Sequence, residues 1–268
     1  MNVDRYLDRI GLTDPGPADL PADLDTLHTI VPAHATSVPF ENLDIVGHPH
    51  GDYAGDGVSL SLADLYEKVV TRRRGGFCFE INGLFNRLLT ALGFDADRCA
   101  ARIGGDDDSL GHPPANHHTN VVHLDRAYLV DVGTGTPQIR EPIPFDGTPV
   151  EDAVGISWRV VPSDAPLSDY VLQKRDPGAD GWELRYRFQT EPRTLSYFEA
   201  TCEFLANRPN GTFTTGPIVK RSTRNGWVGL DADTLTRRTG TEESATAVDP
   251  EEWDAVLERE FAISLPSV

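Results

Sequence analysis

The hydrophobic pattern of this 268-residue chain changes period near residue 90. Before that point, apolar residues recur at helical spacing, most clearly over 77–92, and Gly93 follows where a C-terminal cap belongs. A shorter helix is predicted over 61–71, because a serine and an aspartate three residues later resemble a capping box. The pattern therefore predicts that the first ninety or so residues are helical.

Beyond residue 90 the chain consists mainly of short runs, most of them rich in Val, Tyr or Trp, with turn residues near or between them. This spacing predicts an antiparallel sheet or a small barrel. The predicted strands are 98–103, 119–124, 128–132, 158–161, 170–174 and 182–189, and later 217–221, 227–230 and 234–237. Further helices are predicted over 195–206 and about 251–261. The order is helical, then β, then mixed α/β, with boundaries near 90 and 195.

The charge balance is strongly acidic, with 42 acidic against 24 basic residues and a net charge of -18. Such a charge repels nucleic acid and anionic membrane surfaces, so neither is a predicted partner. The acidic residues are scattered, and 106–108 is the one short run, which favours a general acidic coat over a patch for a cationic partner. Because a lysine-poor acidic coat suits high intracellular salt, we hypothesise a halophilic source.

The N-terminal segment carries charges every few residues and predicts neither a secretory signal nor a membrane span. The chain has three cysteines, Cys78, Cys99 and Cys202, without disulfide-type or metal-type spacing. We therefore predict free thiols in a cytoplasmic protein. The surroundings of Cys99 and Cys202 predict core positions.

Cys78 stands in the first turn of the clearest predicted helix, directly after a stretch that contains Gly75 and Gly76. Free N–H groups and the helix dipole favour an anion there, and a cysteine beside a cationic histidine can have a pKa of roughly 3.5–7.5. A small buried core residue is the alternative. The glycine pair allows close backbone approach at the helix start, so Cys78 is the candidate nucleophile.

A thiolate nucleophile needs a histidine, and the histidine needs an orienting carboxylate. Asp131 ends an apolar strand, downstream of a group of histidines at 112, 117, 118 and 123. If residues 125–126 form a two-residue hairpin turn, Asn120 lies opposite Asp131. His118 then shares the face of Asp131, and His117 points to the opposite face. This register predicts that His118 is the partner of Asp131.

A metal site is not predicted. Adjacent histidines on a regular strand point to opposite faces and cannot both reach one ion. No HExxH or paired-cysteine motif supplements them.

Three segments resemble the arylamine N-acetyltransferase family. Residues 74–85, RGGFCFEINGLF, match the family's nucleophile motif RGGxCxExNxLF at every fixed position. Residues 37–45 contain PFENL, and residues 129–135 are similar to the family's VDVGFG segment. The resemblance covers nearly the whole chain and weakens after about residue 150. It implies an α+β multidomain fold with a cysteine-protease-like triad core: a helical bundle over 1–90, an antiparallel β-barrel over 91–195 and an α/β lid over 196–268.

The resemblance also implies a triad of Cys78, His118 and Asp131. By this likeness Cys78 takes an acetyl group from acetyl-CoA and passes it, in a ping-pong reaction, to an aromatic amine, hydroxylamine or hydrazine. Acetyl-CoA is then a co-substrate, with no tightly bound cofactor. Outside the triad, Arg74 and Glu41 are predicted to form a structural ion pair that ties the first helices to the loop before Cys78.

Four more motif residues are expected near the substrates. Phe40 is implied either at the acceptor site or as a simple core residue. Thr134 is implied at the acceptor site, where it replaces the family's usual phenylalanine and predicts a wider pocket. Gly133 and Gly135 are expected either to let the CoA tail approach the backbone or simply to end the strand.

Three other functions remain open at this stage. An amide synthase of macrolactam biosynthesis would use the same triad with a carrier-bound acyl substrate. A papain-like or transglutaminase-like enzyme would share the helix-start cysteine, although the local papain signature is absent. A non-catalytic binding module would keep the fold alone.

Overall fold

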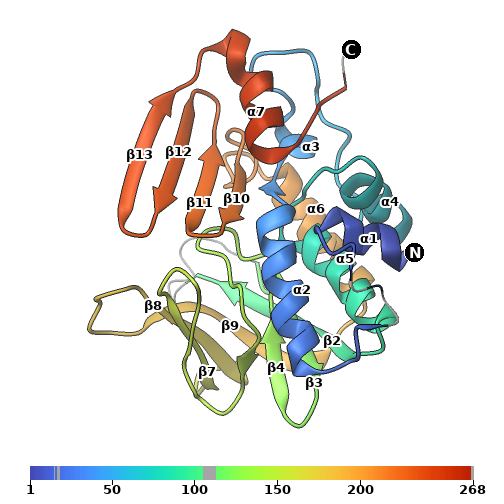
Figure 1. Cartoon of the computed structure of the whole chain (residues 1–268), viewed down its shortest axis with the longest axis vertical. Coiled ribbons are helices and arrows are strands. Elements are labelled where there is room, and N and C mark those ends of the chain that lie inside the picture. Colours follow the sequence, from blue (N-terminus) through green and yellow to red (C-terminus); the bar gives the residue numbers. More distant parts are fainter. Residues whose placement is uncertain (15, 17–18, 105–112, 267–268) are drawn as a thin grey trace.

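The computed structural model of the chain describes residues 1–14, 16, 19–104 and 113–266. It has a group of helices, a strongly curved large sheet below them and a second sheet above, beside the C-terminal helix (Figure 1). This is the predicted α+β fold of helical bundle, nearly closed antiparallel barrel and α/β lid. The acidic run at 106–108 and the histidine at 112 lie outside the described residues.

The helical region ends in α5, which carries the candidate nucleophile. Its elements are α1 Val3–Arg9, α2 Leu24–Ser37, α3 Leu43–Val46, α4 Leu62–Tyr66, a π-helical turn Glu67–Thr71 and α5 Cys78–Ala91. The predicted helices over 61–71 and 77–92 are confirmed. The predicted capping box is wrong, because the Ser61 side chain makes no capping hydrogen bond and Asp64 instead accepts one from Ser59.

The large sheet has eight strands in the order β5-β4-β3-β2-β9-β8-β7-β6, with every neighbouring pair antiparallel. The strands are β2 Asp95–Ile103, β3 His117–His123, β4 Ala127–Val130, β5 Ile143–Pro144, β6 Val150–Glu151, β7 Ser157–Pro162, β8 Tyr170–Arg175 and β9 Glu183–Pro192. Buried aromatic side chains such as Trp158, Tyr186 and Phe188 fill its interior. All six strands predicted in this region are confirmed, with ends shifted by a few residues.

The C-terminal part begins with a 3-10 turn, Leu195–Phe198, and α6 Glu199–Asn207. It continues with β10 Val219–Thr223, β11 Gly226–Leu230, β12 Thr234–Thr239, β13 Glu242–Ala247 and α7 Trp253–Phe261. The sheet order is β1-β10-β11-β12-β13, where β1 is Phe40–Glu41. Strand β13 was not predicted, because its side chains are exposed and lack an apolar alternation. A strand from the helical region therefore completes the C-terminal sheet.

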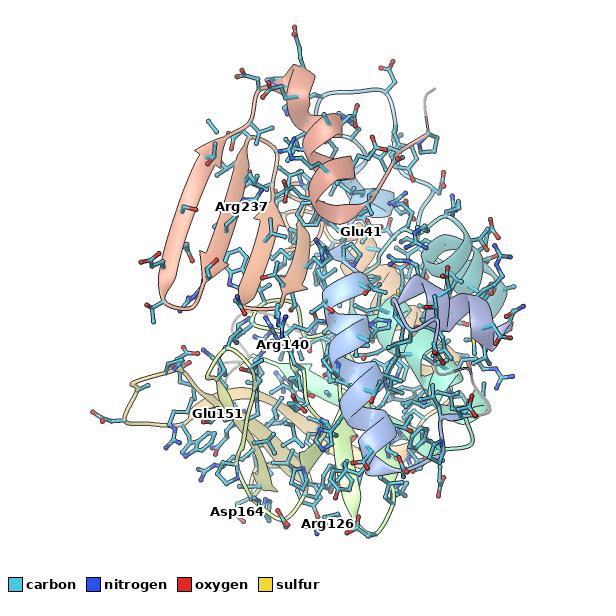
Figure 2. The ribbon with its side chains drawn as sticks, in the orientation of Figure 1. Glu41, Arg126, Arg140, Glu151, Asp164 and Arg237 are labelled. Carbon is cyan, nitrogen blue, oxygen red and sulfur yellow. The ribbon has the colours of Figure 1, made fainter. Side chains whose placement is uncertain are left out.

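Arg140 joins the two sheets (Figure 2). Its guanidinium donates hydrogen bonds to the carbonyl oxygens of Thr223, at 2.6 Å, and Gly226. Ser222 of β10 donates to Gln138 of the same barrel loop, at 3.2 Å. The loop that follows Asp131 is thus held against the C-terminal sheet.

Within the described ranges, no helix is both long enough and apolar enough to cross a bilayer.

Candidate active site

The backbone before Cys78 packs against the strand segment at residues 39–41. The Glu41 N–H donates to the Gly76 carbonyl oxygen at 2.9 Å, and a Cβ at Gly75 would lie 2.0 Å from the Pro39 carbonyl oxygen. Only glycine fits such an approach. The close contact expected at the glycine pair is therefore made by the chain itself.

A buried group of charges holds this loop in place. Arg74 Nη2 lies 2.9 Å from Glu41 and 2.8 Å from Asp44, and Lys68 Nζ lies 2.7 Å from Glu80 and 2.9 Å from Asp44. The predicted Arg74–Glu41 ion pair is confirmed and belongs to a larger network. Removing one partner of a buried pair costs about 3–5 kcal/mol, because the other charge stays buried. The network therefore fixes the start of α5.

The electrostatic surroundings of Cys78 differ from those expected at a bare helix start. Burial raises the pKa of the Cys78 thiol well above its ordinary value, and the nearby Cys202 and Asp131 act in the same direction. The Glu80 carboxylate already accepts the Phe77 N–H, at 3.0 Å, so a negative charge occupies the N-terminus of α5. The expected low thiol pKa is therefore wrong. Loss of the thiol proton therefore depends on a base close to Cys78.

The hairpin β3–β4 has a register one residue away from the predicted one. Asn120 lies opposite Val130, and His123 lies opposite Ala127, so three residues rather than two connect the strands. A shift of one residue exchanges the two faces of a strand. The prediction that His118 shares the face of Asp131 is therefore wrong.

His117 is the histidine that contacts Asp131. Its Nε2 lies 2.7 Å from Asp131 Oδ2, and both side chains are fully buried. Asn82 Nδ2 donates to Asp131 Oδ1 at 2.8 Å, and the Tyr186 hydroxyl donates to Oδ2 at 2.7 Å. Burial raises the pKa of Asp131, but His117 together with these two donors outweighs burial and holds the pKa at about 2. In the neutral form of the ring, an ionised Asp131 fixes the proton of His117 on Nε2 and leaves Nδ1 as an acceptor.

His118 packs on the other face of β3. Its ring stacks on Phe198 with centroids 4.7 Å apart and an interplanar angle of 18°. Within the described part of the chain, neither ring nitrogen makes a hydrogen bond of normal geometry. Burial lowers the pKa of His118 to about 3, so the ring is neutral at physiological pH. His118 therefore packs against Phe198, and His117 takes the position beside Asp131.

Gly133 brings the barrel into contact with the start of α5. A Cβ there would lie 2.6 Å from Asn82 Nδ2 and 3.1 Å from Cys78 Cα. The Gly133 N–H also donates to Asp131 Oδ1 at 2.8 Å. This contact places Cys78 beside the turn that carries Asp131, and the Asp131 carboxylate is one of the groups that raise the pKa of the thiol.

Replacing Gly133 with alanine is expected to reduce turnover about 100-fold or more, since small displacements of reacting groups have effects of that size. The added Cβ would push Asn82 and Cys78 away from Asp131. Steady-state kinetics and thermal unfolding measure the result. Gly181→Ala is the matched control, because nothing lies within 4 Å of a Cβ at Gly181. Full activity of Gly133→Ala would contradict the contact.

The other predicted site residues take up different positions. Phe40 is buried and its ring lies 6.1 Å from that of Phe213. Thr134 is also buried, and its hydroxyl accepts the Ile139 N–H at 3.4 Å, so it turns toward its own loop. Gly135 has a φ of +71° and open space where a Cβ would be.

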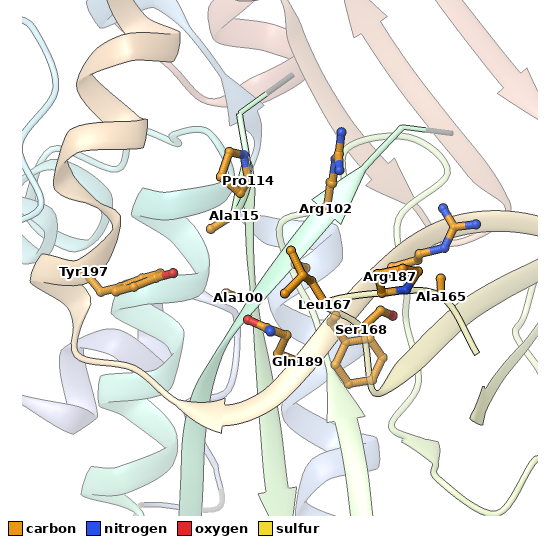
Figure 3. Close-up of a pocket in the computed structure, with 13 residues that line it drawn as sticks. Ala100, Arg102, Pro114, Ala115, Ala165, Leu167, Ser168, Arg187, Gln189 and Tyr197 are labelled. Carbon is orange, nitrogen blue, oxygen red and sulfur yellow. The ribbon is translucent and has the colours of Figure 1, made fainter. Parts of the chain in front are cut away.

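A cavity of about 550 Å³ lies beside strands β2 and β9 (Figure 3). Ala100 and Ala101 in its lining are the cross-strand partners of His118 and His117. Tyr197 enters it from the opposite side. The lining does not include Cys78, so this cavity does not by itself define where a substrate meets the thiol.

In the described ranges, no group of three or more His, Cys, Asp or Glu side chains is arranged to hold a metal ion. All three cysteines are free, and Cys99 and Cys202 are buried as predicted.

Two partners of Asp131 were not predicted. Asn82 lies within the nucleophile motif, so its position in the motif was the available signal. Tyr186 lies 55 residues from Asp131 in the chain and reaches it only because β9 pairs with β2. No local pattern marks such a residue.

The fold and the site together define a class of proteins. A cysteine at a helix start lies near a buried carboxylate of the barrel, and that carboxylate holds a histidine at 2.7 Å. These three residue types together are typical of enzymes that form acyl-cysteine intermediates.

Comparison with known proteins finds relatives and solved structures of that class. The N-acetyltransferase family model matches residues 23–268. The arylamine N-acetyltransferase of Mycolicibacterium smegmatis is 38% identical over 229 residues, covering 82% of this chain and 76% of that protein. A solved structure of the enzyme from M. smegmatis has a TM-score of 0.80 at 33% identity, covering 97% of this chain and 92% of that one. Proansamycin X synthase of Amycolatopsis mediterranei is 30% identical, covering 97% and 96%. The chain belongs to the arylamine N-acetyltransferase family.

Proposed function

We propose that the protein transfers an acetyl group from acetyl-CoA, through Cys78, to an aromatic amine, hydroxylamine or hydrazine. The observation that carries the proposal is the buried 2.7 Å hydrogen bond between His117 and Asp131, joined to Cys78 through Gly133. We divide the chain at about residues 90 and 195. The first part then carries Cys78, the second carries His117 and Asp131, and the third acts as a lid.

In the first half-reaction, Cys78 Sγ attacks the thioester carbonyl carbon of acetyl-CoA, and its proton passes to His117 Nδ1. Asp131 stays ionised and stabilises the imidazolium. The tetrahedral intermediate collapses, the bond to the CoA sulfur breaks, and His117 returns the proton to that sulfur. N–H groups at the start of α5, including that of Cys78, are candidates for stabilising the oxyanion.

In the second half-reaction, the amine nitrogen attacks the acetyl-cysteine carbonyl and gives its proton to His117. The carbon–sulfur bond then breaks, and the sulfur of Cys78 takes that proton. The raised pKa of the thiol supports this order, because the proton must leave as the sulfur attacks.

Intact-protein mass spectrometry tests the proposal. Mixing the protein with acetyl-CoA should add about 42 daltons, one acetyl for one hydrogen, on Cys78. The adduct should disappear on addition of an arylamine such as 4-aminosalicylate, with formation of the acetylated amine. A folded protein that gains no adduct would refute the proposal.

A second candidate is amide synthesis on a carrier-bound acyl substrate, which the likeness to proansamycin X synthase favours. Such an enzyme would be slow to accept acetyl from acetyl-CoA. The same mass measurement, repeated with a long-chain acyl thioester in place of acetyl-CoA, separates the two.

For the substrate-contacting residues we keep Phe40 and Thr134 at the acceptor site and Gly133 and Gly135 near the CoA tail. The small side chain of Thr134 supports an acceptor preference different from the family's usual one, since it stands where the family usually has a phenylalanine. The open space beside Gly135 supports close approach of a ligand to the backbone there.

We further propose a cytoplasmic protein from a salt-rich interior. The net charge of -18 and three free cysteines support this setting. Thermal unfolding is expected at lower temperature in dilute buffer than in molar potassium chloride, because salt screens the repulsion between acidic groups. Equal stability in both would count against it.

A further inference from the structure

Strand β9 has a β-bulge next to the candidate active site. Tyr186 lies opposite Leu172 of β8, but Gln173 lies opposite Leu184, so Arg185 is an extra residue on β9. Such bulges redirect a side chain and are frequent beside active sites.

Two consecutive side chains of β9 reach the same short turn. The Tyr186 hydroxyl donates to Asp131 Oδ2 at 2.7 Å, and the Arg185 guanidinium donates through Nη2 to the carbonyl oxygen of Thr134. Consecutive side chains of a regular strand point to opposite faces. The bulge is what lets both hold the turn at residues 131–134.

The polar backbone groups of this turn have specific partners. Asn82 Oδ1 accepts the Val132 N–H at 2.9 Å, and Gln138 donates to the Val132 carbonyl oxygen. Together with the Gly133 N–H on Asp131, these contacts hold the first half of the turn, and Arg185 holds the second half. Loss of the Arg185 hydrogen bond to the Thr134 carbonyl oxygen would therefore displace Gly133, the residue through which the barrel contacts Cys78.

A neutral donor would satisfy the Thr134 carbonyl, so the charge of Arg185 needs a separate reason. Burial lowers the pKa of Arg185, while the Asp131 carboxylate raises it, which places the guanidinium within the field of Asp131. Burying a cation against a neutral carbonyl is costly, and the nearby carboxylate offsets part of that cost.

We infer that Arg185 is a positioning residue for acyl transfer. It holds the 131–134 turn so that Asp131 keeps its hydrogen bond with His117 and Gly133 keeps its contact with Cys78. This inference rests on the proposed function, and it concerns the rate of the chemical step more than the binding of either substrate.

Three substitutions separate its contributions. Arg185→Met removes donor and charge, Arg185→Gln keeps a donor, and Arg185→Lys keeps a donor and the charge. Arg185→Met is expected to lower kcat about 10- to 100-fold with KM for acetyl-CoA nearly unchanged, because only the alignment of reacting groups is lost. Arg185→Lys should recover most of the loss and Arg185→Gln less. Arg175→Met, on the neighbouring strand against Trp182, is the matched control.

Equal loss in all three variants, in step with a lower Tm, would assign Arg185 a structural role only and overturn the inference. So would an unchanged kcat in Arg185→Met. Hydrogen exchange at the Gly133 amide provides a readout that needs no substrate: it should accelerate in Arg185→Met and not in Arg175→Met. If the wild-type protein forms no acetyl-enzyme, the proposed function fails. The role of Arg185 in holding the turn is tested separately, and an unchanged exchange rate of the Gly133 amide in Arg185→Met would overturn it.

Discussion

Replacing Cys78 with serine is expected to abolish acetyl-enzyme formation and to lower amine acetylation at least about 10⁴-fold, the size of loss seen when a nucleophile is removed from such a triad. Serine keeps the size of the side chain in a fully packed position. Its hydroxyl is a far weaker nucleophile, and His117 would have to remove a proton from a group with a much higher pKa. The measurement combines single-turnover acetylation, followed by mass, with steady-state transfer to an arylamine.

Cys99→Ala is the control for this experiment. Cys99 is as buried as Cys78 but lies in the barrel interior, so its loss should leave the rate within about threefold of wild type. Residual acetylation of Cys78→Ser at more than a per cent of the wild-type rate would mean that another group carries the acetyl.

The second large effect separates the two adjacent histidines. His117→Phe is expected to lower acetylation about 10³-fold or more, because Asp131 loses its partner and Cys78 loses its base. His118→Phe should stay within about tenfold of wild type, because a neutral ring stacked on Phe198 is exchanged for another apolar ring. Rates of Cys78 acetylation measure both.

Circular dichroism and thermal unfolding establish that each variant is folded. The reverse pattern, with His118→Phe inactive and His117→Phe active, would identify His118 as the base. It would contradict the assignment of His117 from the hairpin register. Similar losses of activity in both variants would show that the two histidines cannot be told apart as the base for Cys78.

Much of the fold was predictable because it depends on local patterns. The apolar stripe of the helix over 77–92 predicted α5, and the β-rich runs between 98 and 189 predicted six strands of the barrel. The C-terminal sheet was only partly predictable. Strand β13 has no apolar face, and β1 is two residues long, so neither leaves a periodic signal.

The error at the histidines has one physical cause. Register in a hairpin depends on the number of residues in its turn, and one residue decides which face a side chain takes. A two-residue turn selects His118, whereas the observed three-residue connection selects His117. Nothing in the composition of the turn distinguished the two lengths.

Sequence patterns alone predicted the candidate nucleophile at a helix start, the carboxylate at the end of a strand, the Arg74–Glu41 pair and the family. These depend on residue types at short, fixed spacings. The three-dimensional structure was needed to show that His117 faces Asp131, that burial raises the pKa of the Cys78 thiol, and that Asn82, Tyr186 and Arg185 contact the 131–134 turn. Register, burial and contacts between distant strands set those properties, because each depends on which parts of the chain become neighbours in space.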